Sequence, residues 1–214
     1  MTEGWIDLDH EFDLDIAYDP SQWLEIPPRW ETETWQDIRA WAQECAELLW
    51  RSYGQDPGES GIPFLADTLR RCADAFVPEG FDTRVLLRVW DPLTMPLPLV
   101  AVVRPAEGER DQTLHDFVLA EDSQAVEAPV VEEHRAKLVG DGLRAFCYLR
   151  QDDGPEVLAG LRYAWRDDEA GADVVLWTAT DDVGQILRAA DDIERLTHSV
   201  RVRELLSRTR LEGS

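Results

Sequence analysis

The chain has 214 residues, of which 44% are apolar, and this is enough apolar material for a sizeable core. Its formal net charge of −23 repels the phosphates of nucleic acids and anionic membrane surfaces, so we expect neither as a partner. No apolar run approaches the roughly 18 residues that a membrane-spanning helix requires.

The first residues carry no basic segment followed by an apolar one, so a secretory signal is not expected. The three cysteines, Cys45, Cys72 and Cys147, are far apart and form no CxxC pair. This spacing argues against a disulfide framework and against a cysteine-built zinc site, and it fits buried thiols in a reducing cytoplasm.

The N-terminal segment 6–16 alternates strictly between acidic residues and residues that are mostly apolar. A period of two predicts a strand with one dry face and one wet face. The wet face holds Asp7, Asp9, Glu11, Asp13 and Asp15. A short second strand is expected over 22–26, and Pro27 and Pro28, which follow directly, end it.

Two amphipathic helices are predicted next, over 34–53 and 63–76, from apolar residues that recur at helical spacing. Strands then dominate, over 84–90 and 97–103, with a further strand expected over 113–119. The stretch 121–129 is expected to be a loop.

From His134 onward the pattern predicts antiparallel strands over 134–139, 143–150, 157–165 and 174–179, with a hairpin loop at Gly140-Asp141-Gly142. A third helix is expected over 182–199, followed by a frayed tail over 203–214. Segregated helices and strands with tight loops predict a single α+β domain over 1–202. Its core would be a mainly antiparallel sheet of six to eight strands, flanked by helices.

Four short segments resemble a known family: Tyr18-Asp19-Pro20-Ser21-Gln22-Trp23-Leu24-Glu25-Ile26-Pro27, Gly140-Asp141-Gly142-Leu143-Arg144-Ala145, Asp191-Asp192-Ile193-Glu194-Arg195-Leu196 and Ser199-Val200-Arg201-Val202. Together the segments resemble actinobacterial proteins that look like members of the Mog1/PsbP-like superfamily. The resemblance implies an α/β/α sandwich with helices on both faces of an antiparallel sheet, and a binding or assembly role without a shared catalytic centre. It transfers no functional residue, and the acidic N-terminal strand has no place in the family pattern.

Motifs that carry chemistry are absent from the sequence, which contains no HExxH, GxSxG, GxxxxGK or GxGxxG pattern. The four histidines are scattered, so no cofactor and no metal is predicted. An enzyme whose site assembles from distant residues remains an alternative, and so does a DNA mimic that occupies a basic nucleic-acid-binding groove.

The favoured hypothesis is a non-catalytic acidic protein-interaction or assembly protein whose partner has a basic surface. The first interpretation of the acidic row is a solvated strand face, and a docking surface and a weak cation site are the alternatives. Five carboxylates without an interleaved lysine or arginine exceed what edge protection needs, which suggests docking as a hypothesis. Trp23 and Trp30, which flank the proline pair, could belong to a second apolar layer or anchor the partner.

Overall fold

The computed structural model describes residues 11–28, 30, 34–54, 56–76, 82–121, 125–150 and 157–205. The strands are β1 Glu11–Asp15, β2 Trp23–Ile26, β3 Thr83–Arg88, β4 Leu97–Pro105, β5 Val130–Ala136, β6 Gly140–Arg150, β7 Val157–Asp167, β8 Ala172–Thr180 and β9 Arg201–Leu205. The helices are α1 Ile38–Tyr53, α2 Gly61–Ala75, α3 Arg110–Phe117 and α4 Val183–Thr197.

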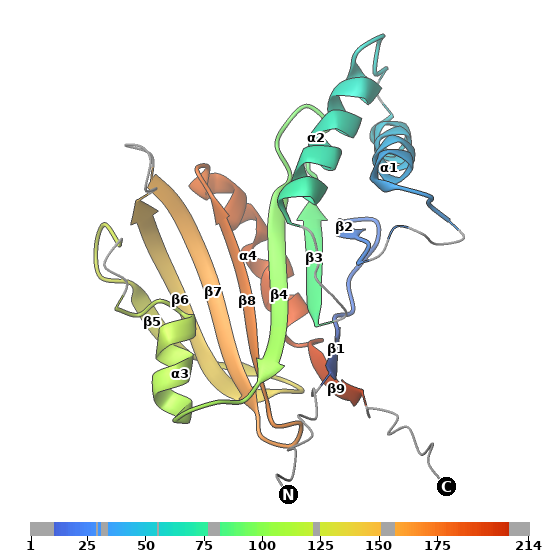
Figure 1. Ribbon diagram of the computed structural model, residues 1–214. Helices are drawn as coiled ribbons and strands as arrows, with labels where there is room; N and C mark the ends of the chain where they lie inside the picture. Colours follow the sequence, from blue (N-terminus) through green and yellow to red (C-terminus); the bar gives the residue numbers. More distant parts are fainter. Residues whose placement is uncertain are drawn as a thin grey trace, which may run out of the picture.

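A seven-stranded sheet in the order β2-β3-β4-β8-β7-β6-β5 forms the centre of the molecule, and each of its pairings is antiparallel. Helices α1, α2 and α3 lie on one face, and α4 lies on the other (Figure 1). The predicted α+β fold with helices flanking an antiparallel sheet is therefore confirmed. None of the helices in the described residues is long and apolar enough to cross a membrane.

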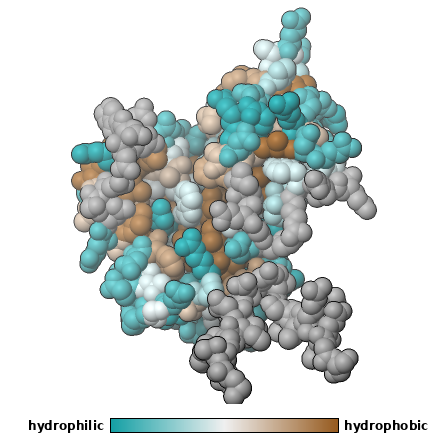
Figure 2. Space-filling model, in the orientation of Figure 1, coloured by the Kyte–Doolittle hydropathy of each residue, from teal (hydrophilic) through white to brown (hydrophobic). Residues whose placement is uncertain are grey.

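The core divides into three apolar clusters, one for each group of elements that packs on the sheet. The largest lies between α4, β1 and the sheet, and includes Leu14, Trp165 and Ile193. A second joins α1 and α2 to β2, β3 and β4, and a third lies under α3. Figure 2 shows hydrophobic residues on the sheet between the helices, whose outer surfaces are mostly hydrophilic.

Helix α1 begins at Ile38, later than predicted, because the Asp37 side chain accepts hydrogen bonds from the backbone N–H groups of Arg39 and Ala40. These two donors have no partner within the helix, so an aspartate caps them well. The helix ends at Gly54, whose φ of 64° suits glycine.

The strand predicted over 113–119 is wrong, because residues 113–117 belong to helix α3 and residues 118–119 to the turn that follows it. Glu109 caps the helix by accepting a hydrogen bond from the N–H of Gln112, which satisfies a free donor of the first turn. Leu114 and Val118, four residues apart, are the fully buried members of the segment. Tertiary packing of this pair overrides the strand preference of the threonine, phenylalanine and valine side chains.

The β5–β6 hairpin turns earlier than predicted, at residues 137–139, and Gly140 already begins β6 with a φ of 89°. Gly142 lies within the strand and not in the loop. A Cβ atom there would overlap the carbonyl oxygen of Ala164 and the indole of Trp165. The second glycine is therefore required by close packing against β7.

The tail predicted to fray from residue 203 contains strand β9, which pairs antiparallel with β1. Asp13 faces Arg203 and Asp15 faces Arg201 across this two-stranded ribbon, so the cross-strand neighbours carry opposite charges. Residues 206–214 lie outside the described part of the chain, as do residues 6–10 of the predicted first strand.

Candidate partner-binding site

A groove of about 520 Å³ lies between α1 and the edge strand β2. Its lining is mainly apolar: Pro20, Trp23, Leu24, Cys45, Leu48, Leu49, Leu87 and Val89, with Ser21, Gln22, Ser52 and Tyr53 as the polar members. Among the residues that the structure describes, no charged side chain lines the groove. Such a site suits apolar side chains, with a few polar groups to fix their orientation.

Both walls of the groove are held in place by local hydrogen bonds. On the β2 side, the Asp19 carbonyl accepts from the N–H groups of Gln22 and Trp23, each at 2.9 Å, which forms the turn into the strand. On the α1 side, the Tyr53 hydroxyl donates to the Val89 carbonyl at 2.6 Å and ties the end of the helix to the end of β3. The groove is thus preformed.

Leu48 is the one exposed large hydrophobic residue of the described lining, with 51% of its surface accessible. One helical turn before it, Cys45 is buried, and this burial raises the pKa of its thiol to about 12. The thiol therefore remains protonated at neutral pH and is a poor nucleophile. The chemistry of the groove is that of an apolar contact surface.

Acidic residues stand next to the lining residues in the chain. Asp19 precedes Pro20, while Glu44 and Glu47 are exposed on α1 beside Cys45 and Leu48. Hydrogen bonds from the Ser21 hydroxyl and N–H lower the pKa of Asp19, so this carboxylate is ionised at neutral pH. Arg51 and Arg88 also adjoin the lining, so the preference for a positively charged partner rests mainly on the net charge of −23.

Within the acidic row, the structure pairs two of the five predicted carboxylates with arginines. Asp13 lies 3.1 Å from a guanidinium nitrogen of Arg84, whose Nε also donates to the Leu14 carbonyl at 2.6 Å. Asp15 lies 3.1 Å from Arg203. The neutralising cations thus come from β3 and β9 and not from the strand itself. Asp7, Asp9 and the side chain of Glu11 lie outside what the structure describes.

The two predicted tryptophans both belong to apolar layers. Trp23 is only 3% exposed, and its ring lies 5.8 Å from the Arg88 guanidinium carbon. Trp30 is partly buried and packs edge-on against Trp41 at 5.6 Å between ring centroids. Trp23 adjoins the groove but packs in the core on the opposite face of the sheet, so Leu48 offers the larger contact.

A partly buried polar network joins β5, β7 and α4, and its members are 31 or 60 residues apart in the sequence. His134 Nε2 lies 2.9 Å from Glu194 Oε1, and Trp165 Nε1 donates to His134 Nδ1 at 3.3 Å. The Tyr163 hydroxyl donates to the same glutamate at 3.3 Å. The i, i+4 pair of Glu194 and His198 is the single hint in the sequence.

The Trp165 donor fixes the tautomer of His134: Nδ1 accepts, so Nε2 carries the proton and donates it to Glu194. Neither ring nitrogen then has a free lone pair for a metal or for a substrate proton. Among the described residues there is no group of three or more His, Cys, Asp or Glu side chains that could hold a metal ion. The network joins α4 to the sheet.

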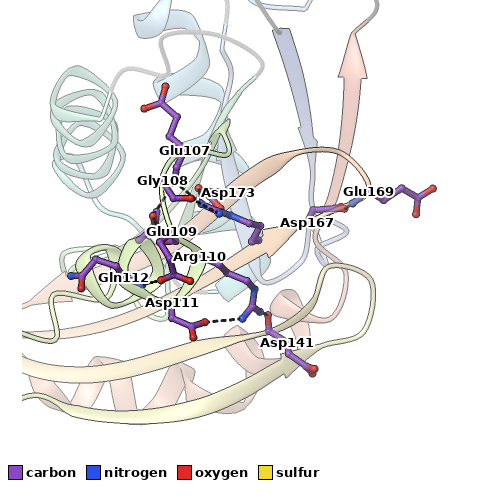
Figure 3. A network of polar contacts seen from close by, with 12 residues as sticks. Glu107, Gly108, Glu109, Arg110, Asp111, Gln112, Asp141, Asp167, Glu169 and Asp173 are labelled. Atoms are coloured by element: carbon purple, nitrogen blue, oxygen red, sulfur yellow. Dashed lines mark hydrogen bonds and ion pairs between the residues drawn. The ribbon is translucent and has the colours of Figure 1, made fainter.

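A larger and more polar hollow of about 600 Å³ lies beside α3 and the β5–β6 hairpin. Figure 3 shows Arg110 reaching from α3 toward Asp141; it donates to the Asp141 carbonyl at 2.7 Å and lies 3.3 Å from the Asp111 carboxylate. Carboxylates and guanidinium groups are mixed along this lining. Arg110 pairs with Asp111 and Arg135 pairs with Asp141, so this lining presents both charges, and the α1–β2 groove is the better candidate.

Comparison of the sequence with models of known protein families and with curated proteins found no match.

Proposed function

We propose that the protein is a non-catalytic interaction or assembly protein that binds a basic partner protein at the α1–β2 groove. The exposed Leu48 in a preformed, uncharged groove is the observation that supports this most strongly. A few residues that pack well and are fully desolvated carry most of the binding energy of a typical interface. The surrounding negative charge, part of a net charge of −23, speeds the encounter with a positively charged partner.

A binding role is preferred to catalysis because the titratable groups that the fold brings together are hydrogen-bonded to one another. His134 and Glu194 bond to each other and to aromatic side chains, and they lie away from the groove. A general base needs a free lone pair within reach of a substrate proton, and His134, which bonds through both ring nitrogens, has none.

The proposal is tested by affinity capture from the native cell extract with two matched variants of the full chain. Leu48→Glu places a charge in the groove, while Leu187→Glu places the same charge at a 69% exposed position on α4. Both substitutions put a good helix former at an exposed helical site, so both variants are expected to fold.

Quantitative mass spectrometry of the captured proteins provides the result. We expect at least one protein with a basic surface to be captured by the wild type and by Leu187→Glu, and to fall at least tenfold with Leu48→Glu. Its recovery should also fall as salt rises, because salt screens the attraction. Identical captured sets for the wild type and Leu48→Glu would contradict the proposal.

A further inference from the structure

Resting on the function proposed above, we propose that the occupant of the groove is an extended segment of the partner that adds as a strand to β2. An apolar side chain of this segment enters the groove beside Leu48, and lysine or arginine residues lie on either side of it. Backbone hydrogen bonds supply affinity in this mode of recognition, and pockets for alternate side chains supply specificity.

The backbone of β2 has an edge suited to such a strand. The Trp23 N–H donates to the Asp19 carbonyl and not across to β3, so Trp23 and Arg88 form a pair without mutual hydrogen bonds. Hydrogen-bonded and non-hydrogen-bonded pairs alternate along an antiparallel ladder, so Glu25 and Leu86 also form a pair without mutual hydrogen bonds. The N–H and carbonyl of Glu25 point away from β3, toward an edge with which no described strand pairs.

The alternation of side chains along β2 connects this edge to the groove. Leu24 and Ile26 pack with the α1–α2 cluster, whereas Trp23 belongs to the core on the opposite face. A residue of the added strand that lies level with Leu24 points to the same face of the sheet. That face is where Leu24, Leu48 and Leu49 line the groove.

Charge selects a basic segment and disfavours a second copy of the chain. Asp19, Glu44 and Glu47 are exposed chain neighbours of lining residues, and the ionised state of Asp19 is supported by its hydrogen bonds from Ser21. Two copies would each bring a net charge of −23 to the contact. Like charges brought together in this way suppress association.

The experiment uses the full chain and a phage-displayed library of random twelve-residue peptides. Selected peptides are expected to alternate apolar and basic residues, without proline inside the binding stretch. The peptide that is enriched most is then synthesised with a fluorescent label, and its Kd is measured by fluorescence anisotropy at physiological salt.

Three variants separate the groove from the strand edge. Leu48→Glu is expected to weaken binding at least tenfold. Glu25→Pro removes the outward N–H and should weaken binding at least fivefold relative to Glu25→Ala, which removes the same side-chain contacts with Tyr18 and Arg84. In the wild type, the amide hydrogen of Glu25 should exchange at least tenfold more slowly when the peptide is bound, and this measurement requires no variant to fold.

Absence of enriched peptides would overturn the inference. So would peptides with helical spacing, or a bound peptide that leaves the exchange of the Glu25 amide unchanged. If partner capture still depends on Leu48 in those cases, the groove remains the docking site and only the strand addition is rejected. A slowly exchanging Glu25 amide in a dimer of the free protein would identify a second copy as the occupant and would also reject the inference.

Discussion

The ion pair between Arg166 of β7 and Asp173 of β8 should be one of the contacts on which stability depends most. The two nitrogen–oxygen distances are 2.6 and 2.8 Å, with the Asp173 side chain 1% and the Arg166 side chain 10% exposed. Arg166 also donates to the carbonyls of Glu107 and Gly108, at 2.7 and 3.1 Å, and so holds the segment between β4 and α3. Figure 3 shows this segment beside Asp173.

Removing one partner of a buried pair costs about 3–5 kcal/mol, because the other charge is left without compensation. Arg166→Ala leaves the almost inaccessible Asp173 carboxylate unpaired and frees two backbone carbonyls, so we expect a loss of about 5 kcal/mol. Asp173→Ala leaves a long guanidinium side chain that can turn toward water, so about 3 kcal/mol is expected. For a chain of this length, these losses lower Tm by about 6 to 20 °C.

Urea denaturation, followed by tryptophan fluorescence, measures the free energy of unfolding of the wild type, both single variants and the double variant. The double variant should lose less free energy of unfolding than the sum of the two single losses. Each single change leaves one charged side chain without its partner, and the second change removes that side chain. If the free energy of unfolding of both single variants lies within about 1 kcal/mol of the wild-type value, the ion pair does not stabilise the fold as its burial implies.

Two further predictions concern other titratable groups. Asp13→Asn should lower the free energy of unfolding, measured in urea, by about 1–2 kcal/mol, because Asp13 and Arg84 are both largely buried. Asp15→Asn should change it by less than about 0.5 kcal/mol, because Asp15 and Arg203 are both exposed. Equal losses in the two variants would contradict this assignment. Burial raises the pKa of Cys45 from an ordinary 9 to about 12, so the unfolded chain loses this proton first and stability should fall as pH rises above about 9. The wild type should lose about 1 kcal/mol more between pH 8 and pH 10 than Cys45→Ala, and equal losses in urea titrations would contradict the expectation.

Strong periodicity made much of the fold predictable from sequence. In α1, Trp41, Cys45 and Ala42 recur on one face, and in β7 every second residue from Ala159 to Trp165 enters the same core. Such patterns specify an element because its buried face must be apolar wherever the element packs.

The errors occur where a distant partner decides the local structure. Strand β9 exists because β1, more than 180 residues earlier, supplies its hydrogen bonds and a facing aspartate for Arg203. Nothing in residues 201–205 alone distinguishes that strand from a frayed end. Helix α3 has a weak apolar face, and its formation depends on the contact of Leu114 and Val118 with the sheet.

The candidate site was even less predictable, because it is formed by elements that meet only in the folded chain. The acidic row is evident in the sequence, but the arginine that pairs with Asp13 lies 71 residues away. The groove requires α1 to lie over β2 and the end of β3, and Leu48 by itself is an ordinary apolar residue of an amphipathic helix. The packing of the helix gives this residue its exposed position above an apolar floor.

Site-specific photocrosslinking in the native cell tests the partner-binding role of the groove most directly. The photoreactive residue p-benzoylphenylalanine replaces Leu48 in one variant of the full chain and the exposed Leu187 of α4 in the other. We predict that irradiation joins position 48 to one discrete protein through an extended basic segment, and that position 187 gives no such product. Absence of a product at position 48, or the same product at both positions, would contradict the assignment of the α1–β2 groove as the partner-binding site.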